Sequence, residues 1–124
     1  MVRESPDGYL RQINGYLVVE PGRGTATELA AIYRDLADFC IERQIRRVLV
    51  KPSDGNAAEE HALRVALTNM VLAGLPAEFK LALVAEGGRI AARYRDTERD
   101  LCIAGVDARM FETEDSATRW LDGP

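Results

Sequence analysis

The residues that could do chemistry gather in two short stretches, each of which follows an apolar run. Lys51–Asn56 offers a lysine, a hydroxyl, a carboxylate and an amide, whereas Gly87–Arg89 pairs two glycines with an arginine. Glycines let a backbone approach an anion, free N–H groups bind it, and Lys or Arg supplies the counter-charge. The two stretches therefore suggest a small-anion or phosphate site, although turn and cap residues have the same composition. The candidate ligand residues are Lys51, Ser53, Asp54, Asn56, Gly87, Gly88 and Arg89.

A nucleotide cofactor is not expected from the glycine pattern. Gly22-Arg23-Gly24 precedes a predicted helix, but Thr27 stands where the dinucleotide fingerprint has its third glycine. Lys51 ends the next strand, where that fingerprint has an acidic residue. The sequence GxxxxGK[ST] of a phosphate-binding loop does not occur. We therefore predict no cofactor.

The side chains that usually carry catalysis or bind metals are few. His61 is the single histidine and falls toward the outer side of its predicted helix. Cys40 and Cys102 have no CxxC spacing, so we interpret both as buried free thiols rather than a disulfide or metal pair. A serine or cysteine triad would need His61 near Ser53, Cys40 or Cys102, and a surface position makes a general base unexpected. One histidine also leaves no convincing set of ligands for zinc or iron. We predict no catalytic residue, no metal site and no enzymatic activity.

The elements that position these stretches are centred on residues 46–86. Arg47–Lys51 and Lys80–Ala85 are apolar runs typical of buried strands, and Ala57–Ala73 between them has a helical period. A strand, a helix of this length and a second strand form a right-handed crossover with parallel strands. The carboxyl ends of both strands then meet at one edge of the sheet, where α/β proteins bind ligands.

The flanking segments complete an α/β fold. Tyr9–Ile13 and Tyr16–Glu20 surround Asn14-Gly15, a dipeptide that favours a two-residue hairpin turn. Thr25 begins the first helix in a capping box with Glu28. We predict a mixed, mostly parallel sheet of about five strands with an N-terminal hairpin and four helices. Residues 1–124 form a single predicted domain, with 1–8 as a loose lead-in.

The helical periods also assign faces. The predicted buried stripes contain Leu29, Ile32, Leu36, Phe39 and Cys40 in the first helix, Leu63, Leu67, Met70 and Val71 in the second, Ile90, Tyr94, Thr97, Leu101 and Ala104 in the third, and Ala117, Trp120 and Leu121 in the last. On the second helix, Ala62, Val65 and Leu72 fall opposite the buried stripe, around Asn69. An apolar outer face needs a cover, so these four residues are candidates for an interface, such as that of a homodimer.

The bulk composition excludes several partners. The 124 residues are 47% hydrophobic and 29% charged with a formal net charge of −4. A mildly acidic chain gives no electrostatic reason to bind nucleic acid or an anionic membrane. No apolar run reaches the roughly 20 residues of a membrane span, and Met1–Pro6 does not look like a secretory signal. We expect a soluble, cytoplasmic protein.

The C-terminal segment resembles a known family. Val106–Phe111 is followed by Glu114–Leu121, a strand reaching Phe and then an acidic turn before Ala and Trp-Leu. With the element order, this is similar to the STAS domains, the anti-sigma-factor antagonists typified by SpoIIAA, and closest to a divergent SpoIIAA-like branch sometimes grouped with the SEC14 lipid-carrier fold. The resemblance implies a regulatory domain in which a kinase phosphorylates a serine of an Asp-Ser-Ser motif. This chain has Asn56-Ala57-Ala58 at that helix opening, and Ser53 is the only hydroxyl of the loop.

Three functional hypotheses follow. The first is a non-enzymatic STAS-like regulatory or protein-interaction module that binds a protein partner or itself. The second is a carrier of a small anion, lipid or other small ligand at the carboxyl ends of the parallel strands. The third is a phosphorylation switch of the anti-sigma-factor-antagonist type, with Ser53 as the acceptor.

Overall fold

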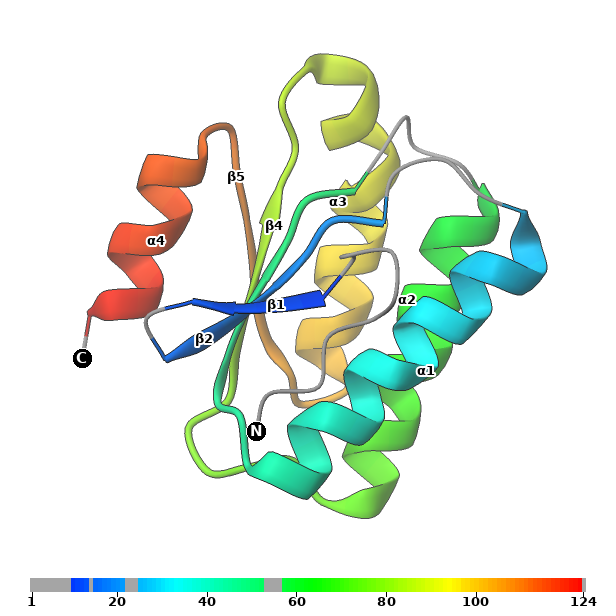
Figure 1. Ribbon diagram of the computed structural model, residues 1–124. Coiled ribbons are helices and arrows are strands. Elements are labelled where there is room, and N and C mark those ends of the chain that lie inside the picture. Colours follow the sequence, from blue (N-terminus) through cyan, green and yellow to red (C-terminus); the bar gives the residue numbers. More distant parts are fainter. Residues whose placement is uncertain (1–9, 14, 22–24, 53–56, 124) are drawn as a thin grey trace.

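The computed structural model describes residues 10–13, 15–21, 25–52 and 57–123 and contains the predicted α/β fold (Figure 1). The elements are β1 (Leu10–Ile13), β2 (Tyr16–Val19), α1 (Ala26–Arg43), β3 (Arg47–Val50), α2 (Ala57–Ala73), β4 (Lys80–Val84), α3 (Gly88–Ile103), β5 (Asp107–Phe111) and α4 (Glu114–Asp122). The predictions of a mixed, mostly parallel sheet and of four helices are confirmed for these residues.

The five strands lie in the order β1-β2-β3-β4-β5. Strand β1 pairs antiparallel with β2, and Ile13 opposite Tyr16 leaves a connection of two residues. Gly15 in this connection has φ +86°, as a tight hairpin turn requires, whereas Asn14 lies outside the described residues. All other neighbours are parallel, including β3 and β4, where Val48 is paired with Leu81. The hairpin and the parallel crossover are thus both confirmed.

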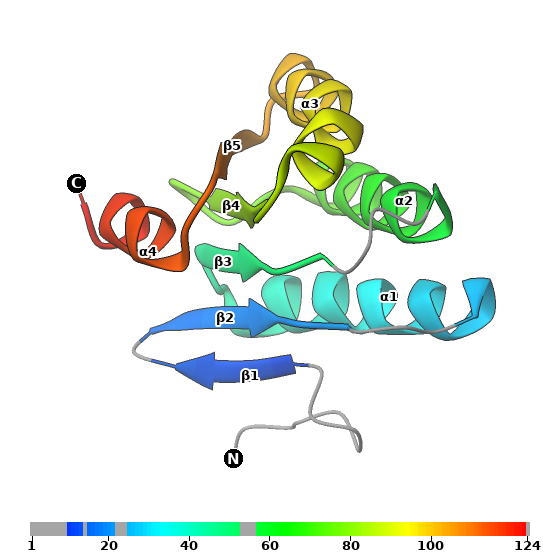
Figure 2. The same ribbon diagram turned by 90° about the horizontal axis from the view of Figure 1, so that it is seen from above.

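The helices form two unequal layers. Each crossover between parallel strands steps to the next strand in the sheet, so right-handed connections put their helices on one face. Helices α1, α2 and α3 accordingly lie side by side on one face, and α4 lies on the other (Figure 2). Helix α4 follows the last strand and is free to cross to the uncovered face.

The central strands are buried on both faces, which explains their uninterrupted apolar sequences. In β3, Val48 and Val50 pack with α1, α2 and α3, whereas Leu49 packs in a second cluster with Ala117 and Leu121 of α4. Strand β4 alternates in the same way. The larger core therefore lies under the three helices and the smaller one under α4.

Two assignments near the end of α3, those of Cys102 and Ala104, are wrong. Cys40 is fully buried, but Cys102 is exposed, and its Sγ contacts the carbonyl oxygen of Ala108 at 3.3 Å. Ala104 is exposed rather than part of the inner row, because α3 ends at Ile103 and the chain turns at Gly105, where φ is +101°. The other predicted inner residues of α3 are buried, except that Ile90 is partly exposed.

Candidate functional site

The predicted ligand residues lie partly in the structure and partly outside it. Lys51 directly follows β3, and Gly87–Arg89 follow β4 and begin α3. Because β3 and β4 are parallel neighbours, both segments belong to the same edge of the sheet, as predicted. Ser53, Asp54 and Asn56 lie outside the described residues, as do Gly22-Arg23-Gly24.

Lys51 lies between carboxylates. Its Nζ is 3.5 Å from Oε2 of Glu20 and 3.5 Å from Oε2 of Glu114. Glu20 is also 3.1 Å from Nη2 of Arg11. These pairs are partly exposed and contribute little to stability, but they neutralise the lysine. An anion bound by Lys51 would have to compete with two carboxylates that belong to the protein.

The start of α3 has the backbone freedom that the sequence suggested. Gly87 is the N-cap with φ +131°, and no side chain caps the helix. Gly87, Gly88 and Arg89 are all exposed. The loop thus presents backbone and one cation to solvent, without a side chain that would define a ligand.

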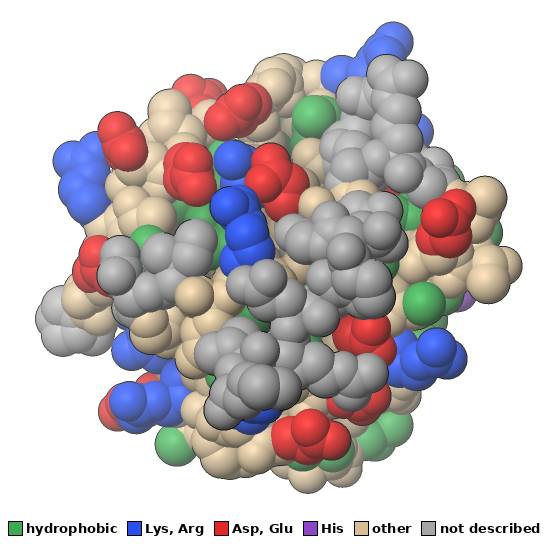
Figure 3. All heavy atoms as spheres, viewed as in Figure 1, with side chains coloured by type: hydrophobic (Ala, Val, Ile, Leu, Met, Phe, Trp, Pro, Cys, Tyr) green, Lys and Arg blue, Asp and Glu red, His purple; other side chains and the backbone are tan. Residues whose placement is uncertain are grey.

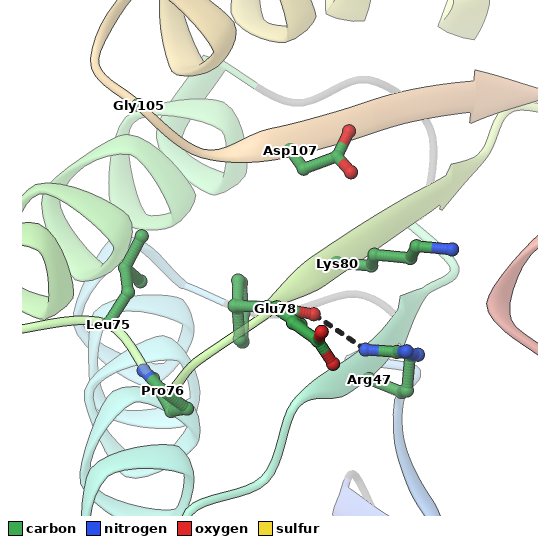
Figure 4. A pocket seen from close by; sticks show the side chains of 8 residues that line it. Arg47, Leu75, Pro76, Glu78, Lys80, Gly105 and Asp107 are labelled. Carbon is green, nitrogen blue, oxygen red and sulfur yellow. Dashed lines mark hydrogen bonds between the residues drawn. The ribbon is translucent and has the colours of Figure 1, made fainter. Parts of the chain in front are cut away.

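A large hollow lies at the opposite edge of the sheet, beside the amino ends of β3, β4 and β5 (Figure 4). Its volume is about 750 Å³, and Arg47, Lys80 and Asp107 stand in register on the three neighbouring strands. Arg47 donates to the carbonyl oxygens of Glu78 (2.6 Å) and Leu121 (3.0 Å). The hollow is completed by Leu75, Pro76, Glu78, Phe79 and Gly105.

The two cations of this hollow are used to fix α4. Lys80 donates to the carbonyl oxygen of Trp120 at 3.3 Å, and its Nζ lies 5.0 Å from the centre of the Trp120 ring. Arg47 binds the next carbonyl, that of Leu121. Cations at the carboxyl end of a helix satisfy its free carbonyls and complement its dipole. Their role here is therefore structural.

A second hollow separates α1 and α2, which lie side by side in Figures 1 and 2. Its volume is about 330 Å³, its floor is formed mainly by alanines, and Arg34 and His61 are its basic residues. A smaller hollow of about 220 Å³ continues it along the same pair of helices, and Asn69 lines both. We call the two together the α1–α2 groove. The first hollow is lined by Ala26, Ala30, Arg34, Ala58, His61, Ala62, Val65, Ala66 and Asn69, and the second by Ala37, Asp38, Ile41, Glu42, Asn69, Met70 and Ala73.

Of the predicted interface residues, Val65, Asn69 and Ala62 line this groove, whereas Leu72 lines neither hollow. Val65 and Leu72 are 45% and 81% exposed, and Asn69 is exposed as well. Ala62 is only 7% exposed, so its assignment to an outer face is wrong. The helical wheel placed it opposite the sheet, but α1 covers that side of α2. Ala62 instead forms part of the groove floor.

Three ionisable groups of the interior, one thiol and two phenols, are held in their protonated forms. Burial raises the pKa of the Cys40 thiol from 9.0 to about 12. Burial and the neighbouring Glu59 raise the pKa of Tyr33 well above 10.0, and the Tyr33 hydroxyl donates to Oε2 of Glu59 at 2.8 Å. Burial, followed by the nearby carboxylates, also raises the pKa of Tyr94. Protonated phenols and a protonated thiol are poor general bases and nucleophiles at neutral pH.

Glu59 shows what sequence reasoning missed here. The sequence suggests a capping residue three positions after Asn56, which lies outside the described residues; the Glu59 side chain is in addition fully buried and accepts a hydrogen bond from Tyr33 of α1. A buried glutamate points to a hydrogen-bond partner in the interior, but the sequence alone does not show that Glu59 is buried. Nothing in the local sequence identifies Tyr33 as its partner.

The charged surface offers no large area of one sign on the face drawn in Figure 3. Basic and acidic side chains are interspersed there, outside the residues drawn in grey. Within the described part of the chain, no group of three or more His, Cys, Asp and Glu side chains could hold a metal ion. None of the described helices combines the length and apolar character needed to cross a bilayer.

Comparisons with family models, with curated proteins and with solved structures gave no significant match. The functional argument therefore rests on the surfaces of the molecule itself, and the α1–α2 groove is the most apolar of those described above.

Proposed function

We propose that the protein is a non-enzymatic, STAS-like interaction module that self-associates through the α1–α2 groove. The observation that carries the proposal is an apolar hollow of about 330 Å³ that the exposed Val65 lines, with the exposed Leu72 seven residues, or two turns, further along the same side of α2. Exposed apolar surface that is contiguous with a hollow marks an interaction site more often than single exposed residues do. The resemblance to the STAS domains supports a regulatory role.

The absence of enzymatic activity is part of the proposal. The described ionisable groups with strongly raised pKa values are buried phenols and a buried thiol, which favour a structural role. His61 lies exposed at the groove and has no hydrogen bond to another described residue. General-base catalysis needs a proton acceptor that is positioned next to the reacting group, and these residues supply none.

The alternative functions have less support. A small-anion or lipid carrier would use Lys51, which two carboxylates already contact. A phosphorylation switch would use Ser53, which lies outside the described residues, so this hypothesis stays a prediction. A phosphate there would act at the opening of α2 through its charge.

The experiment is sedimentation velocity over a series of micromolar concentrations. We expect a concentration-dependent shift from monomer to dimer. A Leu72→Glu variant should weaken the dimer at least about tenfold, because it places a charge in an apolar contact. Ile103→Glu is the matched control, since Ile103 is 78% exposed on α3, away from the groove.

Two results would overturn the proposal. A wild-type chain that stays monomeric throughout the series has no self-association to explain. A dimer that dissociates in Ile103→Glu and persists in Leu72→Glu uses a different surface. Far-ultraviolet circular dichroism of each variant verifies that the helices are retained.

A further inference from the structure

Resting on the proposed function, we infer that the groove is filled by a second copy of the chain, which lies antiparallel to the first about a two-fold axis near Asn69. The inference begins from the spacing on α2. Val65, Asn69 and Leu72 are separated by four and three residues, so they form one stripe of the helix. Asn69 lines both hollows and therefore marks the middle of the groove.

The two halves of the stripe differ in shape. On one side of Asn69 lies the larger hollow with its alanine floor. On the other side Leu72 stands 81% exposed. A two-fold axis at Asn69 brings Leu72 of each copy level with Ala66 of the other, since both are three residues, or about 4.5 Å, from the axis. Each leucine then enters the partner's hollow.

The charges along α1 also differ between the two halves of the groove. Arg34, Asp38 and Glu42 follow one another at intervals of four residues, so they also form one stripe. Arg34 lines the larger hollow, whereas Asp38 and Glu42 line the smaller one. All three are exposed, and no hydrogen bond or ion pair joins their side chains to another described residue.

The polarity selects the direction of docking. Helices α1 and α2 run in the same direction, because both return from the carboxyl edge of the sheet to its amino edge. An antiparallel copy therefore places Arg34 opposite the acidic pair of its partner, and the contact occurs twice. A parallel copy would place like charges together, which is unfavourable.

Asn69 on the axis fixes the register. An asparagine amide both donates and accepts, so two symmetry-related copies can pair with each other. A polar residue at one position of an otherwise apolar helix contact specifies alignment, as it does in coiled coils. The exposed Asn69 between Val65 and Leu72 has this arrangement.

A charge exchange within one chain tests the direction. The variant Arg34→Glu with Asp38→Arg and Glu42→Arg reverses every charge of the stripe and keeps the apolar contacts. In the antiparallel dimer this variant again has opposite charges facing each other, so it should self-associate within about threefold of wild type. Mixed with isotope-labelled wild type, it should form about tenfold fewer heterodimers than random pairing gives. Native mass spectrometry distinguishes the three dimers.

Each other outcome overturns the inference. An excess of heterodimers indicates parallel docking, in which Arg34 faces its own counterpart. Random mixing shows that these charges lie outside the contact, and a folded but monomeric triple variant shows that they are not exchanged across it. In all three cases the proposed self-association still stands if Leu72→Glu dissociates the wild-type dimer and Ile103→Glu does not.

Discussion

Helix α2 has two neighbours on the helical face of the sheet, and its contacts with them have opposite chemistry. Toward α3, the Arg64 guanidinium donates to Asp100 (2.6 Å), Glu60 (3.1 Å) and Thr97 (3.3 Å). Thr97 donates in turn to Glu60 at 2.9 Å. Toward α1, the surface between the helices is a hollow lined mainly by alanines. The hydrogen bond from Tyr33 to Glu59 joins the same two helices, but neither residue lines the hollow.

The difference indicates where a partner can bind. The α2–α3 contact satisfies most of its polar groups internally; Nε of Arg64 and the hydroxyl of Tyr94 are buried without a hydrogen-bond partner. Donors and acceptors that are paired in this way hold two helices at a fixed distance, and few unpaired polar groups remain to bind another molecule. The α1–α2 groove has the reverse property, because its alanines are too small to fill the space between the helices. Its apolar surface gains most from an external cover.

The largest expected effect concerns the groups beneath both contacts. The unfolded chain ionises its thiols and phenols near 9.0 and 10.0, whereas folding raises the pKa of Cys40, Tyr33 and Tyr94. Their contribution to stability is therefore complete below pH 9 and is lost as the pH rises through these values. Each group that stays protonated in the folded chain lowers the free energy of unfolding by about 1.4 kcal/mol for every pH unit above its ordinary pKa. Urea denaturation at pH 8 and pH 11 should thus differ by several kcal/mol.

A Tyr33→Phe variant isolates one of these groups. At pH 8 it should be less stable by about 1–3 kcal/mol, because the buried carboxylate of Glu59 loses its hydrogen bond. Its loss of stability between pH 8 and pH 11 should be smaller than that of wild type, since one titrating phenol is gone. An unchanged pH dependence would show that Tyr33 ionises normally in the folded state.

The next effect tests the polar contact between α2 and α3. Replacing Arg64 by Met keeps an unbranched apolar stem but removes the donors to Asp100, Glu60 and Thr97. Because the arginine side chain is 34% exposed, water compensates in part, and we expect a loss of about 1–2 kcal/mol in urea denaturation. A variant as stable as wild type would mean that the network contributes nothing and that the two contacts of α2 do not differ in this respect. Thr68→Ala on the exposed side of the same helix is the control.

The sequence predicted those parts of the fold that depend on local patterns. The hairpin followed from Asn14-Gly15, and the inner stripe of α2 followed from its helical period. Leu63, Leu67 and Met70 of this stripe are buried, whereas Val71 is partly exposed. The wheel failed for Ala62 because it assumes a single buried side, whereas α2 is covered by the sheet, α1 and α3. A small residue between two helices cannot be told from an exposed one by period alone.

The candidate sites were less predictable because their partners are distant in sequence. Lys51 has the type and the position of an anion ligand, but its two carboxylates come from the end of β2 and the start of α4. The hydrogen bond from Tyr33 to Glu59 spans 26 residues. The cations Arg47 and Lys80 begin apolar strands and are fixed by carbonyls at the end of α4. No local pattern encodes such pairs.

The smallest expected change in stability tests the hollow itself. Ala62 is 7% exposed. In a closed core, replacing such an alanine by a larger residue lowers the stability by about 1–3 kcal/mol. It borders a hollow of about 330 Å³, so an Ala62→Leu side chain has room, and we expect urea denaturation to change by less than about 1 kcal/mol. Ala117→Leu is the matched control, because Ala117 is fully buried on the inner side of α4 and should show the larger cost.

The same Ala62→Leu protein should dimerise more weakly, since its new side chain occupies the space assigned to the partner's Leu72. A variant that is destabilised as much as Ala117→Leu would mean that the floor of the groove is closed, and a variant that dimerises normally would mean that the hollow is not the contact.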